Sequence, residues 1–284
     1  MENLERLGAR IEASCETGYP PMLAEQETPP PVISIRGKAE LLTRPALAIV
    51  GSREASAAGL RMAQMLAADL GAAGYMIVSG LARGVDGAAH AAALETGTIA
   101  VLAGGLDKPY PPQNLKLHDA FAARGAVITE APLGAVARAR DFPRRNHVIS
   151  GLAQAVIVIE AAERSGSLIT ARAAAEQGRD VMAVPGSPLD PRARGSNALI
   201  KQGAALVESA ADAIAALQAS PALLPRAPRP QRLFEPSEPF ARPPGPEDDA
   251  NLVARLAHLL SPTPIHLNEL ARLLNAGWAP SPPR

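Results

Sequence analysis

Apolar residues along the chain fall into short unbroken runs, separated by longer stretches in which apolar and polar positions mix. The runs are rich in valine and isoleucine and do not alternate with polar residues, which is typical of strands covered on both faces of a sheet. Seven runs are expected as strands: ALAIVGS (46–52), YMIVSG (75–80), TIAVLAGG (98–105), AVITE (126–130), AVIVIE (155–160), DVMAVPG (180–186) and AALVES (204–209).

The stretches between these runs are rich in alanine, and several end in glycine, a common stop signal for helices. Strands that alternate with helices predict βαβ units, right-handed crossovers and a mostly parallel sheet. We therefore expect an α/β fold, with a Rossmann-like doubly wound domain over residues 46–219.

The flanking segments are less regular. Residues 1–45 are expected as an N-terminal lead-in packed on the main domain, with one edge strand within 28–37. Residues 220–250 are expected as a Pro-rich linker, since nine prolines fall within 221–246. Two amphipathic stretches then predict an incomplete winged-helix-like segment over 251–284.

Charge and cysteine usage narrow the class of protein. The formal net charge is zero, so any anion site must be a local patch. The single cysteine, Cys15, excludes an internal disulfide framework and fits a reducing compartment. No apolar run approaches the roughly 18 residues of a membrane span, and no signal peptide is recognised. We expect a cytoplasmic protein without a membrane partner.

Candidate chemistry lies after the strands, because ligands of doubly wound sheets bind beyond the carboxyl ends. After the first strand, Gly51, Ser52 and Arg53 precede a helix whose free N–H groups favour an anion. The glycine spacing matches neither GxGxxG nor GxxxxGK[ST], so neither a dinucleotide site nor a P-loop is predicted. An ordinary turn with a solvated arginine is the alternative.

The second strand is followed by Arg83, another candidate for anion binding. Asp86 and His90 lie four positions apart, a spacing that suits a metal or an acid–base pair. No third ligand is near in sequence, and we interpret both residues as bracing the start of a helix.

The densest cationic stretch is DFPRRNHVISG (141–151), which follows Arg138 and Arg140. Arginine matches phosphate with two parallel hydrogen bonds, and an aromatic among cations suits stacking on an unpaired base. The alternative is a solvated basic loop. We predict nucleic-acid contact by a set from this stretch: Arg140, Phe142, Arg144, Arg145 and Asn146.

Two later segments add anion-binding chemistry. Ser165, Gly166 and Ser167 open one helix, and Lys201 lies on the next. We expect these strand ends to share one cleft. The chain contains no GxSxG elbow, paired-carboxylate motif or metal-ligand set, so no catalytic residue, metal or cofactor is predicted.

Several loops together resemble the DNA-processing protein A (DprA/Smf) family. The segments that carry the resemblance, in order over roughly residues 20–210, are AIVGSREASAAG, VSGLARGVDGAAHAAALETGTIAVLAGGLDKPYPPQN, FPRRNHVISGL, SGSLITARAAAEQGRDVMAVPG and GSNALIKQGA. The resemblance implies a homodimeric protein that binds and protects incoming single-stranded DNA and loads RecA in natural transformation and recombination, without established catalytic activity.

The family's motifs map onto particular residues. Its GSR arginine falls on Arg53, its SGSLIT turn on residues 165–170, and its late lysine on Lys201. Its FPxRN signature falls on Phe142, Pro143, Arg145 and Asn146, which leaves Arg144 at the variable position. The sequence departs at His147, where the family usually has arginine, and it lacks the lysine before the FP pair.

Two other functions stay open. The same fold occurs in nucleotide-phosphate hydrolases of the lysine-decarboxylase-like type, which use PGGxGTxxE. The corresponding stretch here, ERSGSLITARAAAE (163–176), has no GT. A role dominated by protein interaction is the other alternative.

Overall fold

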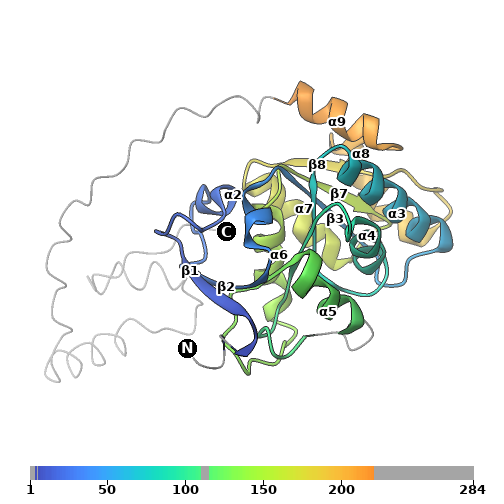
Figure 1. Cartoon of the computed structure of the whole chain (residues 1–284). Coiled ribbons are helices and arrows are strands. Elements are labelled where there is room, and N and C mark those ends of the chain that lie inside the picture. The colour runs from blue at the N-terminus through green and yellow to red at the C-terminus, as the bar shows by residue number, and fades with distance from the viewer. Residues whose placement is uncertain (1–3, 5, 110–114, 221–284) are drawn as a thin grey trace, which may run out of the picture. The chain divides into compact units, whose positions relative to one another are not determined.

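The computed structural model describes residues 4, 6–109 and 115–220, and these residues belong to one compact unit. The expected winged-helix-like segment over 251–284 lies outside the described residues, as does the expected linker after Ser220. Figure 1 shows the sheet of the described unit with helices on both sides.

Nine strands of the described residues form one sheet in the order β1-β2-β6-β5-β4-β3-β7-β8-β9. Seven are mutually parallel and lie within the seven predicted runs: β3 (Ala46–Gly51), β4 (Met76–Ser79), β5 (Thr98–Val101), β6 (Ala126–Thr129), β7 (Ala155–Ile159), β8 (Asp180–Ala183) and β9 (Ala205–Leu206). The chain proceeds outward from β3 in one direction and from β7 in the other. This confirms the doubly wound α/β class and puts the topological switch point between β3 and β7.

The N-terminal segment extends this sheet with two antiparallel strands, β1 (Ala9–Ala13) and β2 (Val32–Gly37). The expectation of an edge strand within 28–37 was wrong in its position, since β2 lies between β1 and β6. β1 is the edge strand on this side of the sheet, and its charged Arg10 and Glu12 pair with each other at 2.9 Å. Charges of this kind suit an open edge, whereas Ile33 and Ile35 of β2 are buried.

Helices cover both faces, and this explains the unbroken apolar runs. On β3, Leu47 and Ile49 pack toward α3 and α4, while Ala48 and Val50 pack toward the opposite layer. One face carries α3 (Ala57–Ala72), α4 (Val85–Ala93), α5 (Leu115–Arg124) and α9 (Ala210–Ala219). The other carries α2 (Pro21–Ala24), η1 (Ala39–Thr43), α6 (Asp141–Gly151), α7 (Gly166–Glu176) and α8 (Arg194–Lys201), with η3 (Pro191–Ala193) leading into α8.

His90 of α4 lies fully buried in the interior. Its Nε2 accepts a hydrogen bond from the Leu81 N–H (3.3 Å), so the ring proton is on Nδ1, which lies 2.7 Å from the Thr98 hydroxyl. That hydroxyl in turn donates to the Ile77 carbonyl. Burial is the main cause that lowers the pKa of His90 to about 3. The imidazole therefore ties α4 to β4 and β5 in its neutral form, as the bracing interpretation predicts.

We predict that acid weakens the fold through His90. The pKa of His90 in the folded protein is below the ordinary value of about 6.5, so the unfolded chain binds the proton first as pH falls. The stabilisation is complete above about pH 6.5 and is lost at a rate approaching about 1.4 kcal/mol per pH unit toward pH 3. Urea unfolding of wild type and His90→Gln should show a stability difference that shrinks as pH falls. A difference that is constant with pH would contradict the prediction.

Candidate functional site

A cleft of about 760 Å³ opens at the switch point, at the carboxyl ends of the central strands. Its walls are the loops after β3 and β4, the first turns of α6 and the loop that leads into α7. Ten of the residues predicted from the sequence line it: Gly51, Ser52, Arg53, Arg83, Phe142, Arg145, Asn146, Ser165, Gly166 and Ser167. Segments distant in the sequence therefore converge as expected.

Three predicted residues lie elsewhere. Arg140 and Arg144 line a neighbouring cleft of about 450 Å³ between α6 and the loop after β6, where Arg144 forms an ion pair with Glu130 (2.7 Å). Lys201 is the last residue of α8, and lines neither cleft. The first turn of α8 lies at the carboxyl edge of the sheet, so its last turn points away from it. A DNA contact by these three residues stays a prediction.

Arg145 forms the floor of the main cleft. Its side chain is buried, and its Nη1 donates to the carbonyl oxygens of Gly80 and Val101, the latter at 3.0 Å. A Cβ at Gly80 would overlap the guanidinium, so a larger residue at that position would displace the Arg145 side chain. The contact joins α6 to the ends of β4 and β5.

The charge of Arg145 is balanced by Asp86, whose carboxylate accepts the N–H groups of Gly80 (3.2 Å) and Ala82 (3.4 Å). Burial lowers the pKa of Arg145 to about 10 against the opposing effect of Asp86, and burial likewise raises the pKa of Asp86. Asp86 therefore braces the loop before α4, in keeping with its interpretation from the sequence. Among the described residues, no group of three His, Cys, Asp or Glu side chains could hold a metal ion.

Phe142 and Arg53 form a second unit in the cleft. The guanidinium carbon of Arg53 lies 5.1 Å from the centre of the Phe142 ring, and that of Arg145 lies 5.6 Å from it. These are cation–π distances. Arg53 is exposed and Phe142 is half-buried, so the pair presents a cation and an aromatic surface together.

The first turn of α7 forms the opposite wall. The side chain of Ser165 caps the helix by accepting from the Ser167 N–H (3.4 Å), and Asn146 donates to the Gly166 carbonyl (3.3 Å). Asn146 thus holds α6 against α7 and is largely buried. A Cβ at Gly166 would meet open space, so the backbone at this helix start is accessible.

The cleft is cationic although the chain is neutral overall. Arg53, Arg83, Arg145 and Arg164 line it, against Glu54 and Asp86. Arg164 was missed by the sequence analysis, although its position just before the Ser165 cap could have indicated it. Ile169, also missed, adds an exposed apolar side chain from α7.

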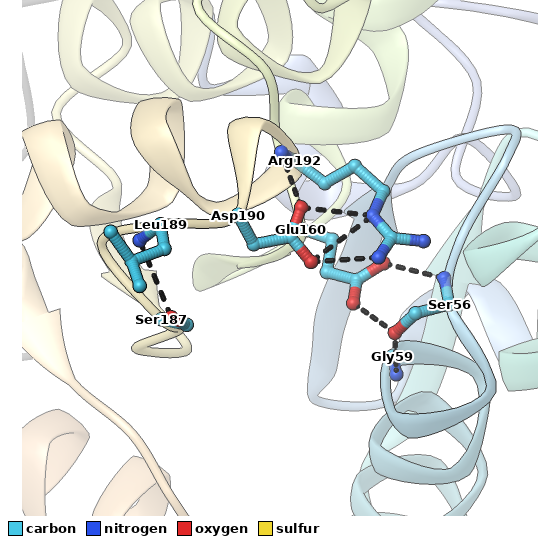
Figure 2. Close-up of polar contacts among 7 residues, drawn as sticks. All are labelled: Ser56, Gly59, Glu160, Ser187, Leu189, Asp190 and Arg192. Atoms are coloured by element: carbon cyan, nitrogen blue, oxygen red, sulfur yellow. Dashed lines mark hydrogen bonds and ion pairs between the residues drawn. The ribbon is translucent and has the colours of Figure 1, made fainter.

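The helix after β3 differs from the expectation. α3 begins at Ala57 with Ser56 as its N-cap, several residues beyond Ser52 and Arg53. The Glu160 carboxylate accepts both the Ser56 N–H (2.8 Å) and the Ser56 hydroxyl, as Figure 2 shows. The expected anion at this helix start is therefore a side chain of the protein itself.

Two residues beside the cleft adopt left-handed backbone conformations that are uncommon outside glycine. Leu81 has φ 55° directly after the Gly80 turn, and Glu160 has φ 48° directly after β7. Such strain collects at ligand sites, where the surrounding structure holds it in place.

We predict that Arg145 and Arg53 differ in their effect on stability. Arg145→Ala leaves two buried carbonyls and the Asp86 carboxylate uncompensated, and should lower the free energy of unfolding by about 3 kcal/mol. Arg53→Ala removes an exposed side chain and should cost less than about 1 kcal/mol. Urea unfolding of both variants tests this, and equal losses would show that Arg145 is not the anchor of the cleft floor.

The sequence profile of the family described as DNA recombination-mediator protein A matches residues 10–218. The protein Smf of Escherichia coli is 40% identical over 277 residues, covering 93% of this chain and 73% of that protein. The DNA processing protein DprA of Bacillus subtilis is 44% identical over 197 residues, covering 68% of this chain and 66% of that protein.

Solved structures agree with the sequence relatives. DprA from Streptococcus pneumoniae superposes with a TM-score of 0.71 at 40% identity, covering 75% of this chain and 77% of that one. DNA processing protein A from Helicobacter pylori, whose structure concerns its binding of single-stranded DNA, has a TM-score of 0.68 at 28% identity, covering 74% and 95%. No helix among the described residues is long and apolar enough to cross a membrane. The chain belongs to the DNA recombination-mediator protein A family, whose members include the DprA and Smf proteins.

Proposed function

We propose that this protein binds single-stranded DNA in the cleft at the switch point, protects incoming DNA and delivers it to RecA for recombination. The observation that carries the proposal is the meeting of Arg53, Phe142 and the first turn of α7 in one cationic cleft. The Helicobacter pylori relative, which binds single-stranded DNA, has the same fold over most of its length.

The two walls of the cleft suit two parts of a nucleotide. The first turn of α7, together with Arg53, Arg83 and Arg164, offers N–H groups and positive charge to phosphates. Phe142 offers a ring on which a base can stack, with the Arg53 guanidinium beside it. Neither contact reads a base edge, so we expect binding that depends weakly on sequence and strongly on salt.

We further propose that the protein acts without catalysis, as a cytoplasmic homodimer. The carboxylates beside the cleft support the first point: Asp86 is held by backbone N–H groups, and Glu160 is held by Ser56. The single cysteine of the chain is compatible with the reducing environment of the cytoplasm. Family membership supports both a homodimer and RecA as a partner. Light scattering tests the dimer, and RecA filament assays on single-stranded DNA bound by this protein test the partnership with RecA.

We predict that Arg53→Ala weakens binding of a poly-dT oligonucleotide by about tenfold and reduces the salt slope by about one, because one phosphate contact is lost. Fluorescence anisotropy at several salt concentrations measures both quantities. Arg61→Ala, an exposed arginine of α3 that does not line the cleft, is the matched control and should bind like wild type. Unchanged affinity of a folded Arg53→Ala protein would place the binding site elsewhere.

Phe142 should act through stacking rather than charge. Phe142→Ala is expected to weaken binding of the same oligonucleotide by about tenfold, since base–aromatic stacking contributes roughly 1–3 kcal/mol. The salt slope should stay as in wild type. Phe142→Trp, which keeps an aromatic ring for stacking, should retain the wild-type affinity. If Phe142→Ala binds normally, the ring serves only to orient Arg53.

A further inference from the structure

The start of α3 is already occupied by a carboxylate of this chain. Glu160 follows β7, yet its side chain reaches across to α3 and accepts the N–H and hydroxyl of Ser56. The Ser56 hydroxyl oxygen in turn accepts the Gly59 N–H (3.0 Å). Figure 2 shows the Glu160 carboxylate between the first turn of α3 and the guanidinium of Arg192. The Asp190 carboxylate accepts hydrogen bonds from Arg192 and is the main cause that raises the pKa of Arg192. The negative charge of Glu160 raises this pKa further.

The N-terminus of a helix that follows a strand at the switch point is a common ligand-binding position in doubly wound folds. The strand at the switch point is followed by a helix whose N-terminus carries unpaired N–H groups and a partial positive charge. Proteins of this architecture that bind nucleotides place a phosphate there. In this sheet the switch point lies between β3 and β7; β3 is the earlier of the two strands in the chain, and α3 is the helix that follows it.

The surrounding residues are shaped around the Glu160 carboxylate. A Cβ at Gly59 would lie 2.5–2.8 Å from its carboxyl atoms, so the absent side chain of Gly59 makes room for it. In nucleotide-binding folds a glycine gives the same access to a phosphate. Glu160 also keeps a left-handed φ of 48°, which is costly for a residue with a long side chain.

We propose that Glu160 is a specificity-determining residue that closes the α3 position to free nucleotides and phosphate. Its carboxylate supplies the negative charge and the hydrogen-bond acceptors that a phosphate would otherwise supply. The first turn of α7, whose accessible backbone faces the cleft, is left as the helix start open to an external anion. The exclusion is a property of the fold and does not depend on DNA binding.

The test removes the carboxylate without disturbing the backbone. Glu160→Gly suits the positive φ and removes the side chain altogether. Glu160→Asn tolerates the same φ, and its side chain is too short to reach Ser56. Both variants should bind ADP and inorganic phosphate with dissociation constants about tenfold lower than wild type. Isothermal titration calorimetry measures the constants, and circular dichroism verifies that each variant is folded.

Two controls and one localising measurement complete the design. Glu160→Gln keeps the shape but loses the charge and one of the two acceptor oxygens, and should bind with an affinity between those of wild type and Glu160→Gly. Glu163→Gly, at an exposed position in the same loop, should bind like wild type. In amide NMR spectra of Glu160→Gly, phosphate should shift the Ser56 signal, and in wild type it should not. If folded Glu160→Gly and Glu160→Asn bind ADP no more tightly than wild type, or if phosphate shifts only α7 signals, Glu160 is a structural cap and not a determinant of specificity.

Discussion

The buried guanidinium of Arg145 connects the pieces from which the cleft is built. It bonds the carbonyl oxygens of Gly80 and Val101 at the ends of β4 and β5, and it neighbours the Asp86 carboxylate. α6 is therefore held over the strand ends, and Phe142, one turn earlier on that helix, is held near Arg53. A buried charge is tolerated only when it is paired, so this constraint couples the position of α6 to the loop before α4.

The structure separates two helix starts that resemble each other in sequence. Both α3 and α7 begin with a serine cap that follows a parallel strand. Glu160 fills the first, while the second faces the cleft with Gly166 unobstructed. The difference lies in the side chain of Glu160, which follows β7 and reaches across the switch point to Ser56.

The cationic character of the cleft is a local property. The chain carries no net charge, yet arginines from four separate segments converge at the carboxyl edge of the sheet. Clustered arginines attract a polyanion electrostatically. Salt screening at physiological ionic strength confines this attraction to distances of about 10 Å, and therefore to the neighbourhood of the cleft. A neutral protein can therefore hold a single strand at one place.

The pattern of the sequence by itself determined the class of fold, the seven parallel strands and most of the cleft. Apolar runs report burial on both faces, and the topology of such sheets brings their carboxyl ends together. Only the tertiary structure decided which cations stay exposed: Arg145 is buried as an anchor, Arg144 pairs with Glu130, and Lys201 lies at the far end of its helix. It also decided that β2 is internal and that Glu160 occupies α3. Strand position and side-chain pairing depend on contacts between residues far apart in the chain, which local periodicity does not encode.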